Sequence, residues 1–211
     1  TNSAGGVVTN SGGATAISAT ADSMDLQSGS SIAGGSGTVT LRPSTLSRNI
    51  NIESGNTTGV LSLTPTELAT VTTTGALEIG RSDNTGTGTL TVNTALFPTD
   101  INAGTLKLFN KTINVTGGFI GSPGTPFNHN LEVRAGDNLT VSQGIQLADG
   151  KSLTLAADND ANHVGNLSIA GNNVIAGSTN ANTGTMTLSG ENITVSGNPA
   201  LTIVELTGSG T

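Results

Sequence analysis

Acidic residues, asparagines and a histidine crowd together in the segment ADNDANH. Asp158, Asp160 and Asn162 occupy alternate positions, as the first three oxygen ligands of an EF-hand loop do, so these three are the calcium candidates of the chain. His163 stands where such a loop requires glycine, and Ile169 stands where it requires a bidentate acid. A polar turn rich in Asp and Asn explains the same cluster without a metal. We therefore predict a turn here and no bound cofactor.

Carboxylates are the second source of chemistry, because polysaccharide lyases and hydrolases need two or three of them on one face of adjacent coils. Asp158 and Asp160 could share such a face. Further carboxylates are those of Glu132, Asp137, Asp149 and Glu191. The chain has no Tyr and no Trp to form the aromatic platforms on which sugar-binding clefts usually rely. We assign no catalytic residue and keep a carbohydrate-active β-helix enzyme as the alternative function.

The composition indicates a folded chain with an unusual surface. Hydrophobic residues make up 34% of the 211 residues and the net charge is −7, whereas disordered chains are poor in aliphatics. Only 10% of residues are charged, so Ser, Thr and Asn must supply much of the solubility. The absence of cysteine excludes disulfides and Cys-ligated zinc. Seven scattered basic residues and the lack of an apolar run of about 20 residues predict neither a nucleic-acid partner nor membrane insertion.

A four-residue unit recurs along the chain: a small or polar residue, an aliphatic residue, a polar residue and another aliphatic residue. The units are TVTL, NINI, VLSL, ALEI, TLTV, TLKL, TINV, NLEV, NLTV, SLTL, NLSI, TMTL, NITV and ALTI. Alternation with period two places the aliphatic side chains on one face and the polar side chains on the other. The units are therefore predicted to be short strands with one buried side.

The units also pair along the sequence, as between Leu106 and Ile113 or between Leu131 and Leu139, seven or eight residues apart. Each pair predicts two strands around one bend. Successive pairs start about 19 to 25 residues apart, the length of one coil of a parallel β-solenoid. The predicted core is a stack of Leu, Ile and Val ladders, with hydrogen-bonded Thr, Ser and Asn stacks outside. A β-sandwich, which also has short strands between turns, is the structural alternative.

One segment, LTPTELATV, breaks this pattern. Thr64 stands before a proline and Glu67 follows three residues later, which is a capping box at the start of a helix. The sequence predicts a short helical turn over about residues 65–72 that buries Leu68 and Val71 on the flank of the solenoid.

Residues 22–92 resemble a module of filamentous-haemagglutinin-like surface proteins of bacteria, through the words MDLQSGSSI, VTLRP, LSLTPTEL and ALEIG. Residues 104–203 resemble the same proteins more loosely, through NLTV, SLTLAADND and NLSI. The resemblance implies a right-handed parallel β-helix in a secreted adhesin or surface fibre that is exported through an outer-membrane partner.

We expect residues 1–211 to form a single β-solenoid segment of a longer chain, with regular coils over residues 104–203. The expected function is that of a non-enzymatic stalk or fibre outside the cell, at the bacterial surface. Unpaired strand edges at the two ends predict association with further copies, end to end or laterally. A host or neighbouring-cell surface is the other expected partner. The loop at 117–130 is expected either to contact a partner or to pack Phe119 and Phe127 over the flank.

Overall fold

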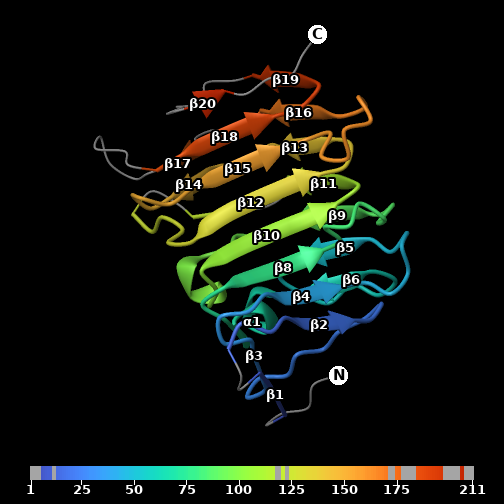
Figure 1. Ribbon diagram of the computed structural model, residues 1–211, viewed down its shortest axis with the longest axis vertical. Helices are drawn as coiled ribbons and strands as arrows, with labels where there is room; N and C mark the ends of the chain where they lie inside the picture. Colours follow the sequence, from blue (N-terminus) through green and yellow to red (C-terminus); the bar gives the residue numbers. More distant parts are fainter. Residues whose placement is uncertain are drawn as a thin grey trace.

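The chain is a stack of parallel strands. The computed structural model describes residues 6–10, 13–116, 120–121, 124–170, 174–176, 184–196 and 205–206. Every strand pair within these ranges is parallel. Parallel pairing confirms the predicted β-solenoid and excludes the sandwich, whose two sheets are antiparallel. The strands stack along the long axis, with β1 and β20 toward opposite ends of it (Figure 1).

The first long side of the solenoid is an eight-stranded sheet. In spatial order its strands are β2 (Ile17–Thr20), β4 (Val39–Arg42), β8 (Ala76–Gly80), β10 (Thr105–Asn110), β12 (Asn130–Ala135), β15 (Leu153–Ala156), β18 (Met186–Ser189) and β20 (Glu205–Leu206). Within this sheet, the strands from β4 to β18 are formed by the predicted units TVTL, ALEI, TLKL, NLEV, SLTL and TMTL. The last unit, ALTI, lies outside the described residues.

The second long side is a seven-stranded sheet. Its strands, from the carboxyl-terminal end of the stack, are β19 (Asn192–Val195), β16 (Asn166–Ile169), β13 (Leu139–Val141), β11 (Thr112–Val115), β9 (Thr89–Val92), β5 (Ile50–Ile52) and β6 (Leu61–Leu63). In most coils a strand of the eight-stranded sheet is followed, around a single corner, by a strand of the seven-stranded sheet, as the paired units predict.

A third side closes each coil and was not predicted as strands. It contains β1 (Val7–Thr9), β3 (Ser31–Ala33) and β7 (Val71–Thr72) in one sheet, β14 (Ile145–Leu147) and β17 (Val174–Ala176) in another, and the short 3-10 helix η1 (Pro98–Asp100). Isolated parallel bridges such as Leu96–Ile120 and Phe127–Leu147 continue it between the two sheets. These segments are too short to display a clear alternation, which explains why the sequence pattern missed them.

Coil length varies more than the sequence pattern predicts. Leu106 pairs with Leu131, which agrees with the predicted interval, but Val39 pairs with Leu77, which lies much further along the chain. The predicted interval is therefore wrong for the longer coils. The extra residues lie in loops and in an inserted strand, β6, which pairs with β5 at the end of the seven-stranded sheet. This added chain leaves the pairing of β4 with β8 intact.

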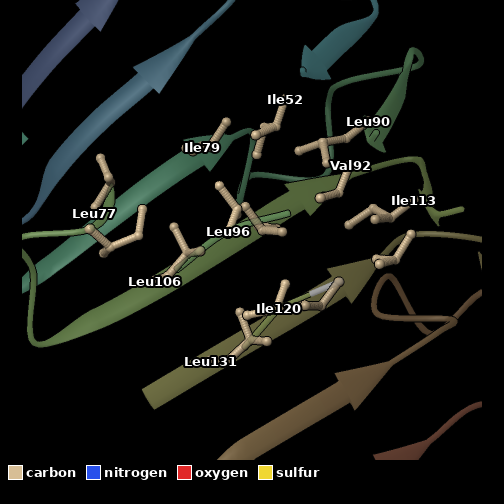
Figure 2. Packing of buried hydrophobic residues seen from close by; sticks show 14 of the residues in the cluster. Ile52, Leu77, Ile79, Leu90, Val92, Leu96, Leu106, Ile113, Ile120 and Leu131 are labelled. Carbon is tan, nitrogen blue, oxygen red and sulfur yellow. The ribbon is translucent and has the colours of Figure 1, made fainter. Parts of the chain in front are cut away.

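The core consists of aliphatic columns that run along the stack. Leu77, Leu106, Leu131 and Leu153 are in register on successive strands, and none is more than 1% exposed. Figure 2 shows Leu90 and Ile113 of the seven-stranded sheet extending toward this column from the opposite wall. Each such side chain contributes about 1.5–3 kcal/mol by burial. The predicted inward alternation is confirmed.

Polar side chains form their own column outside. Asn166 Nδ2 donates to Asn138 Oδ1 at 3.2 Å, and Asn192 Nδ2 donates to Asn166 Oδ1 at 2.9 Å. The backbone N–H of Asn166 also donates to Asn138 Oδ1 at 3.1 Å. This asparagine ladder joins three successive coils and confirms the predicted polar stacks.

The predicted capping box is present at the start of α1 (Pro65–Leu68). Glu67 N–H donates to Thr64 Oγ1 at 3.2 Å, and Thr64 N–H donates to Glu67 Oε2 at 2.8 Å. Leu68 and Val71 are fully buried, as predicted. The predicted length was wrong, because the helix ends at Leu68 and Val71 lies in β7. The helix ends early because the residues after it pair with β3, where Ile32 N–H donates to Thr70 O at 3.0 Å.

The strand β6 closes the amino-terminal end of the seven-stranded sheet. It pairs with β5 on the side away from β9, so the chain adds a strand beneath β5 before α1 leads it back to the stack. Leu61 and Leu63 of this strand are fully buried. This insertion accounts for the long coil between Val39 and Leu77.

Candidate functional site

Charged residues from successive coils meet at the corner between the eight-stranded and the seven-stranded sheet. Lys111 lies between β10 and β11, Asp137 between β12 and β13, residues 157–165 between β15 and β16, and Glu191 between β18 and β19. Parallel stacking brings these connections above one another, about 4.8 Å apart per coil. We call residues 111, 137, 157–165 and 191 the acidic corner.

The ADNDANH segment forms the turn that the sequence predicts. Ala161 N–H donates to Asp158 O at 3.0 Å, and Val164 N–H donates to Asn162 Oδ1 at 2.8 Å. Asp158 and His163 both adopt left-handed backbone conformations, with φ of 54° and 62°. Asp158 N–H donates to Asp137 O at 3.1 Å, which anchors the turn on the preceding coil.

The three calcium candidates have different surroundings. Asp160 Oδ2 lies 3.5 Å from Lys111 Nζ, which also lies 2.6 Å from Asp137 Oδ1. The hydrogen bond with Asp137 is the largest contribution that raises the pKa of Lys111, and the charges of both carboxylates add to it. Asn162 Nδ2 donates to Asp160 Oδ2 at 3.0 Å. Asp160 and Asn162 thus stabilise the corner through contacts with other protein groups, whereas the Asp158 carboxylate lies near His163 and Glu191.

Asp158 belongs to a second group, with His163 and Glu191. One ligand atom of each lies within 4.8 Å of the others. His163 Nδ1 lies 3.3 Å from Glu191 Oε2, and the His163 side chain is 80% exposed. We call these three residues the His–Asp–Glu cluster. The sequence pattern did not predict the cluster, because His163 and Glu191 are separated by 28 positions. The feature of the sequence that could have indicated the cluster is the pairing of NLSI (β16) with NITV (β19), because it places Glu191 beside the end of the turn.

The alternative enzyme hypothesis needs two or three carboxylates on one face of adjacent coils, and three acidic side chains within hydrogen-bond reach in one groove would favour it. Within the part of the chain that the structure describes, no three carboxylates have ligand atoms all within 4.8 Å of one another, and two carboxylates with one histidine form the group that does. The non-enzymatic function stays a prediction, and the carbohydrate-active enzyme stays its alternative.

Glu132 lies in an ion-pair network on the outer face of the eight-stranded sheet. Its carboxylate is 3.1 Å from Lys107 Nζ and contacts the guanidinium of Arg134. Burial raises the pKa of Glu132, but the hydrogen bonds and positive charges of Arg134 and Lys107 outweigh it and hold this pKa below its usual value.

A second carboxylate with a lowered pKa is Asp22. It accepts from Thr45 N–H at 2.7 Å and from Thr45 Oγ1 at 2.6 Å, and these hydrogen bonds are the main reason why its pKa is strongly lowered.

We expect the fold to lose stability in acid. A carboxyl whose pKa is lowered by folding contributes stability that is complete above about pH 5 and is lost as the pH falls through the folded value. The urea midpoint should therefore be lower at about pH 3 than at pH 7. Glu132→Gln should reduce this difference, whereas Thr154→Ala, which changes the non-ionisable residue paired with Glu132, should not. An identical pH dependence in Glu132→Gln would contradict the assignment.

The amino-terminal end carries an apolar groove. A cavity of about 330 Å³ is lined by residues that include Val8, Ala19, Met24 and Ile32. Val8 is 46% exposed. The groove lies beside β2, which is the terminal strand of the eight-stranded sheet.

The outer edge of β2 has no strand partner among the described residues. Ile17 N–H donates to Thr38 O at 2.9 Å and Ala21 N–H donates to Arg42 O at 3.0 Å, both toward β4. In a parallel pair alternate residues bond to the same neighbour, so Ser18 and Thr20 direct their backbone groups away from β4. This edge could therefore accept a further strand.

The loop at 117–130 contributes to the core. Phe127 is fully buried, and Ile120 is fully buried beside it in the third side. His129 contacts Phe127 edge to face at 5.0 Å, and its ring nitrogens lie 2.7 Å from Ala103 O and 3.1 Å from Pro98 O. Phe119 lies outside the described residues. The buried position of Phe127 favours packing over partner contact for the second half of the loop.

Comparison of the chain with family models, with curated proteins and with solved structures finds no match. The resemblance to filamentous-haemagglutinin-like proteins therefore stays a prediction. No helix in the described part of the chain is long and apolar enough to cross a membrane.

Proposed function

We propose that this chain is a non-enzymatic structural segment of a secreted or cell-surface fibre, in which it acts as a rigid stalk. The observation that supports this proposal is the continuous register of the core. From Val39 through Leu77, Leu106 and Leu131 to Leu153, each inward side chain lies above the one before it. Bending such a stack requires many backbone and side-chain contacts to open at once.

The outer surface suits a fibre that stays soluble outside the cell. The asparagine ladder and the ion pairs of Lys107 and Arg134 with Glu132 join neighbouring strands on the polar faces. The net charge of −7 is spread over a surface with few ionised groups. Contact with a host or neighbouring-cell surface through this polar face is part of the proposal.

End-to-end association is the second part of the proposal. The outer edge of β2 presents the backbone groups of Ser18 and Thr20, and Ala19 and Val8 line the apolar groove beside it. A parallel strand from another copy would extend both the hydrogen-bonded ladder and the aliphatic column, as every internal coil does.

Ser18→Pro tests this edge. Proline removes an N–H that is directed away from β4, so the β2–β4 pairing should persist while strand addition is blocked. We expect the sedimentation coefficient of the natural protein to rise with concentration, and that of Ser18→Pro to stay constant. Ser18→Thr, which keeps the N–H, is the matched control and should behave like the natural protein. A natural protein that stays monomeric at high concentration, or a proline variant that associates equally well, would contradict this part of the proposal.

The enzyme alternative is tested separately. Incubation with acidic and neutral polysaccharides, followed by measurement of new reducing ends and of unsaturated products, should give no product above the protein-free control. Product formation that is lost in Asp158→Asn would overturn the non-enzymatic proposal and favour a carbohydrate-active enzyme.

A further inference from the structure

The His–Asp–Glu cluster has the composition of a transition-metal site. An imidazole nitrogen and two carboxylate oxygens are ligands of zinc, and tetrahedral zinc with bonds of about 2.0–2.2 Å separates its ligand atoms by about 3.4 Å. His163 Nδ1 and Glu191 Oε2 are already 3.3 Å apart, and the Asp158 ligand atom lies within 4.8 Å of both. A movement of at most about 1.4 Å by the partly exposed Asp158 side chain brings its ligand atom to the tetrahedral separation.

The charge of the acidic corner favours a cation. Lys111 is paired with Asp137 and Asp160, so its charge is already shared between two carboxylates. No lysine or arginine forms an ion pair with Asp158 or Glu191 within the residues that the structure describes. A divalent ion would neutralise both remaining carboxylates.

The three ligands come from two successive coils. Asp158 and His163 lie in the turn between β15 and β16, and Glu191 lies in the connection between β18 and β19. Backbone hydrogen bonds join the turn to both neighbouring coils. Asp158 N–H donates to Asp137 O of the preceding coil at 3.1 Å, and Glu191 N–H of the following coil donates to Gly165 O at 3.0 Å. The backbone thus holds two of the ligands in place before any ion arrives.

We propose that Asp158, His163 and Glu191 bind a divalent transition-metal ion of the zinc type, with water in the remaining position, and that this ion cross-links the two coils. The exposed imidazole of His163 gives the ion direct access from solvent. Calcium is not the expected ion, because it prefers six to eight oxygen ligands and the imidazole offers nitrogen. The ion site does not depend on the proposed stalk function.

The chain offers little competition for zinc elsewhere. It has no cysteine and only two histidines. The ring nitrogens of the other one, His129, both face backbone carbonyl oxygens, at 2.7 and 3.1 Å. Zinc binding by the folded protein can therefore be assigned through one histidine.

The test is titration of the chelator-treated protein with zinc chloride, followed by calorimetry and by thermal unfolding. We expect one zinc ion per chain and a rise in melting temperature that EDTA reverses, because an ion that binds only the folded state stabilises it. Calcium chloride should give no rise. His163→Asn keeps a residue that tolerates the left-handed backbone, so it should fold normally. It should weaken zinc binding by more than about tenfold, the least that loss of even an outer-shell partner causes.

Asp160→Asn is the matched control. It removes a carboxylate from the same turn but none of the proposed ligands, so the zinc-dependent rise should remain. Glu191→Gln, in the other coil, should abolish the rise and so demonstrate the cross-link. The proposal is overturned if zinc gives no rise in the natural protein, or if the rise persists in His163→Asn. A calcium-dependent rise that Asp160→Asn removes would also overturn it, in favour of the oxygen-ligand loop.

Discussion

Leu106→Ala is expected to lower the free energy of unfolding by about 2–5 kcal/mol. Leu106 is fully buried and lies in register between Leu77 and Leu131, so truncation opens a cavity in the middle of an aliphatic column. The coils above and below are held by their own backbone ladders and cannot collapse into the space. Urea unfolding followed by circular dichroism measures the loss.

Lys107→Ala is the control for Leu106→Ala, because Lys107 is the next residue of β10 and faces outward. Its side chain is 32% exposed and lies 3.1 Å from Glu132, so its loss should cost no more than about 1 kcal/mol. Equal losses in the two variants would show that the alternation of buried and exposed positions does not carry the stability.

Glu67→Ala is expected to lower the free energy of unfolding by about 2–4 kcal/mol, because it leaves buried donors without an acceptor. Glu67 is 6% exposed. Its Oε2 accepts from Thr64 N–H and Oγ1, both at 2.8 Å, and its Oε1 accepts from Leu26 N–H at 3.1 Å. One carboxylate thus caps α1 and also joins it to a segment 41 positions away.

Glu67→Gln separates these two contributions. Glutamine also completes a capping box but keeps only one carbonyl oxygen, so a smaller loss than in Glu67→Ala is expected. Hydrogen exchange should show the Leu26 amide losing protection in the alanine variant, while the amides of β12 keep theirs. A uniform loss of protection along the chain, or no difference from the natural protein, would be incompatible with the local role of Glu67.

The sequence was sufficient for features that depend on near neighbours. The alternation in TLKL and NLTV predicts a strand and assigns Leu106 and Leu139 to the core, because side chains two residues apart share a face. Thr64 and Glu67 predict a helix start, because a capping box joins residues three positions apart. The parallel stacking was predicted from the recurrence of paired units, since each coil needs a neighbour to bury its aliphatic face.

The candidate site shows where that sufficiency ended. Asp158 was named from the sequence, but together with Asp160 and Asn162, which share its turn. The structure pairs Asp160 with Lys111 and brings Asp158 to His163 and Glu191. A fixed period cannot indicate which corner residues lie together, because the coils differ in length. The number of residues from Ile17 to its partner Val39 differs from the number between Val39 and its partner Leu77.

Local pattern was thus enough for most strands of the two long sides, their buried faces, the cap of α1 and the solenoid class, because each follows from contacts within a few residues or from repetition of one unit. The folded chain was needed to establish that β6 lies beneath β5, that Glu67 reaches Leu26 and that His163 meets Glu191. These contacts depend on the register between coils. Loop length determines which corner residues lie above one another, and chain inserted between strands changes this without altering the alternation within each strand.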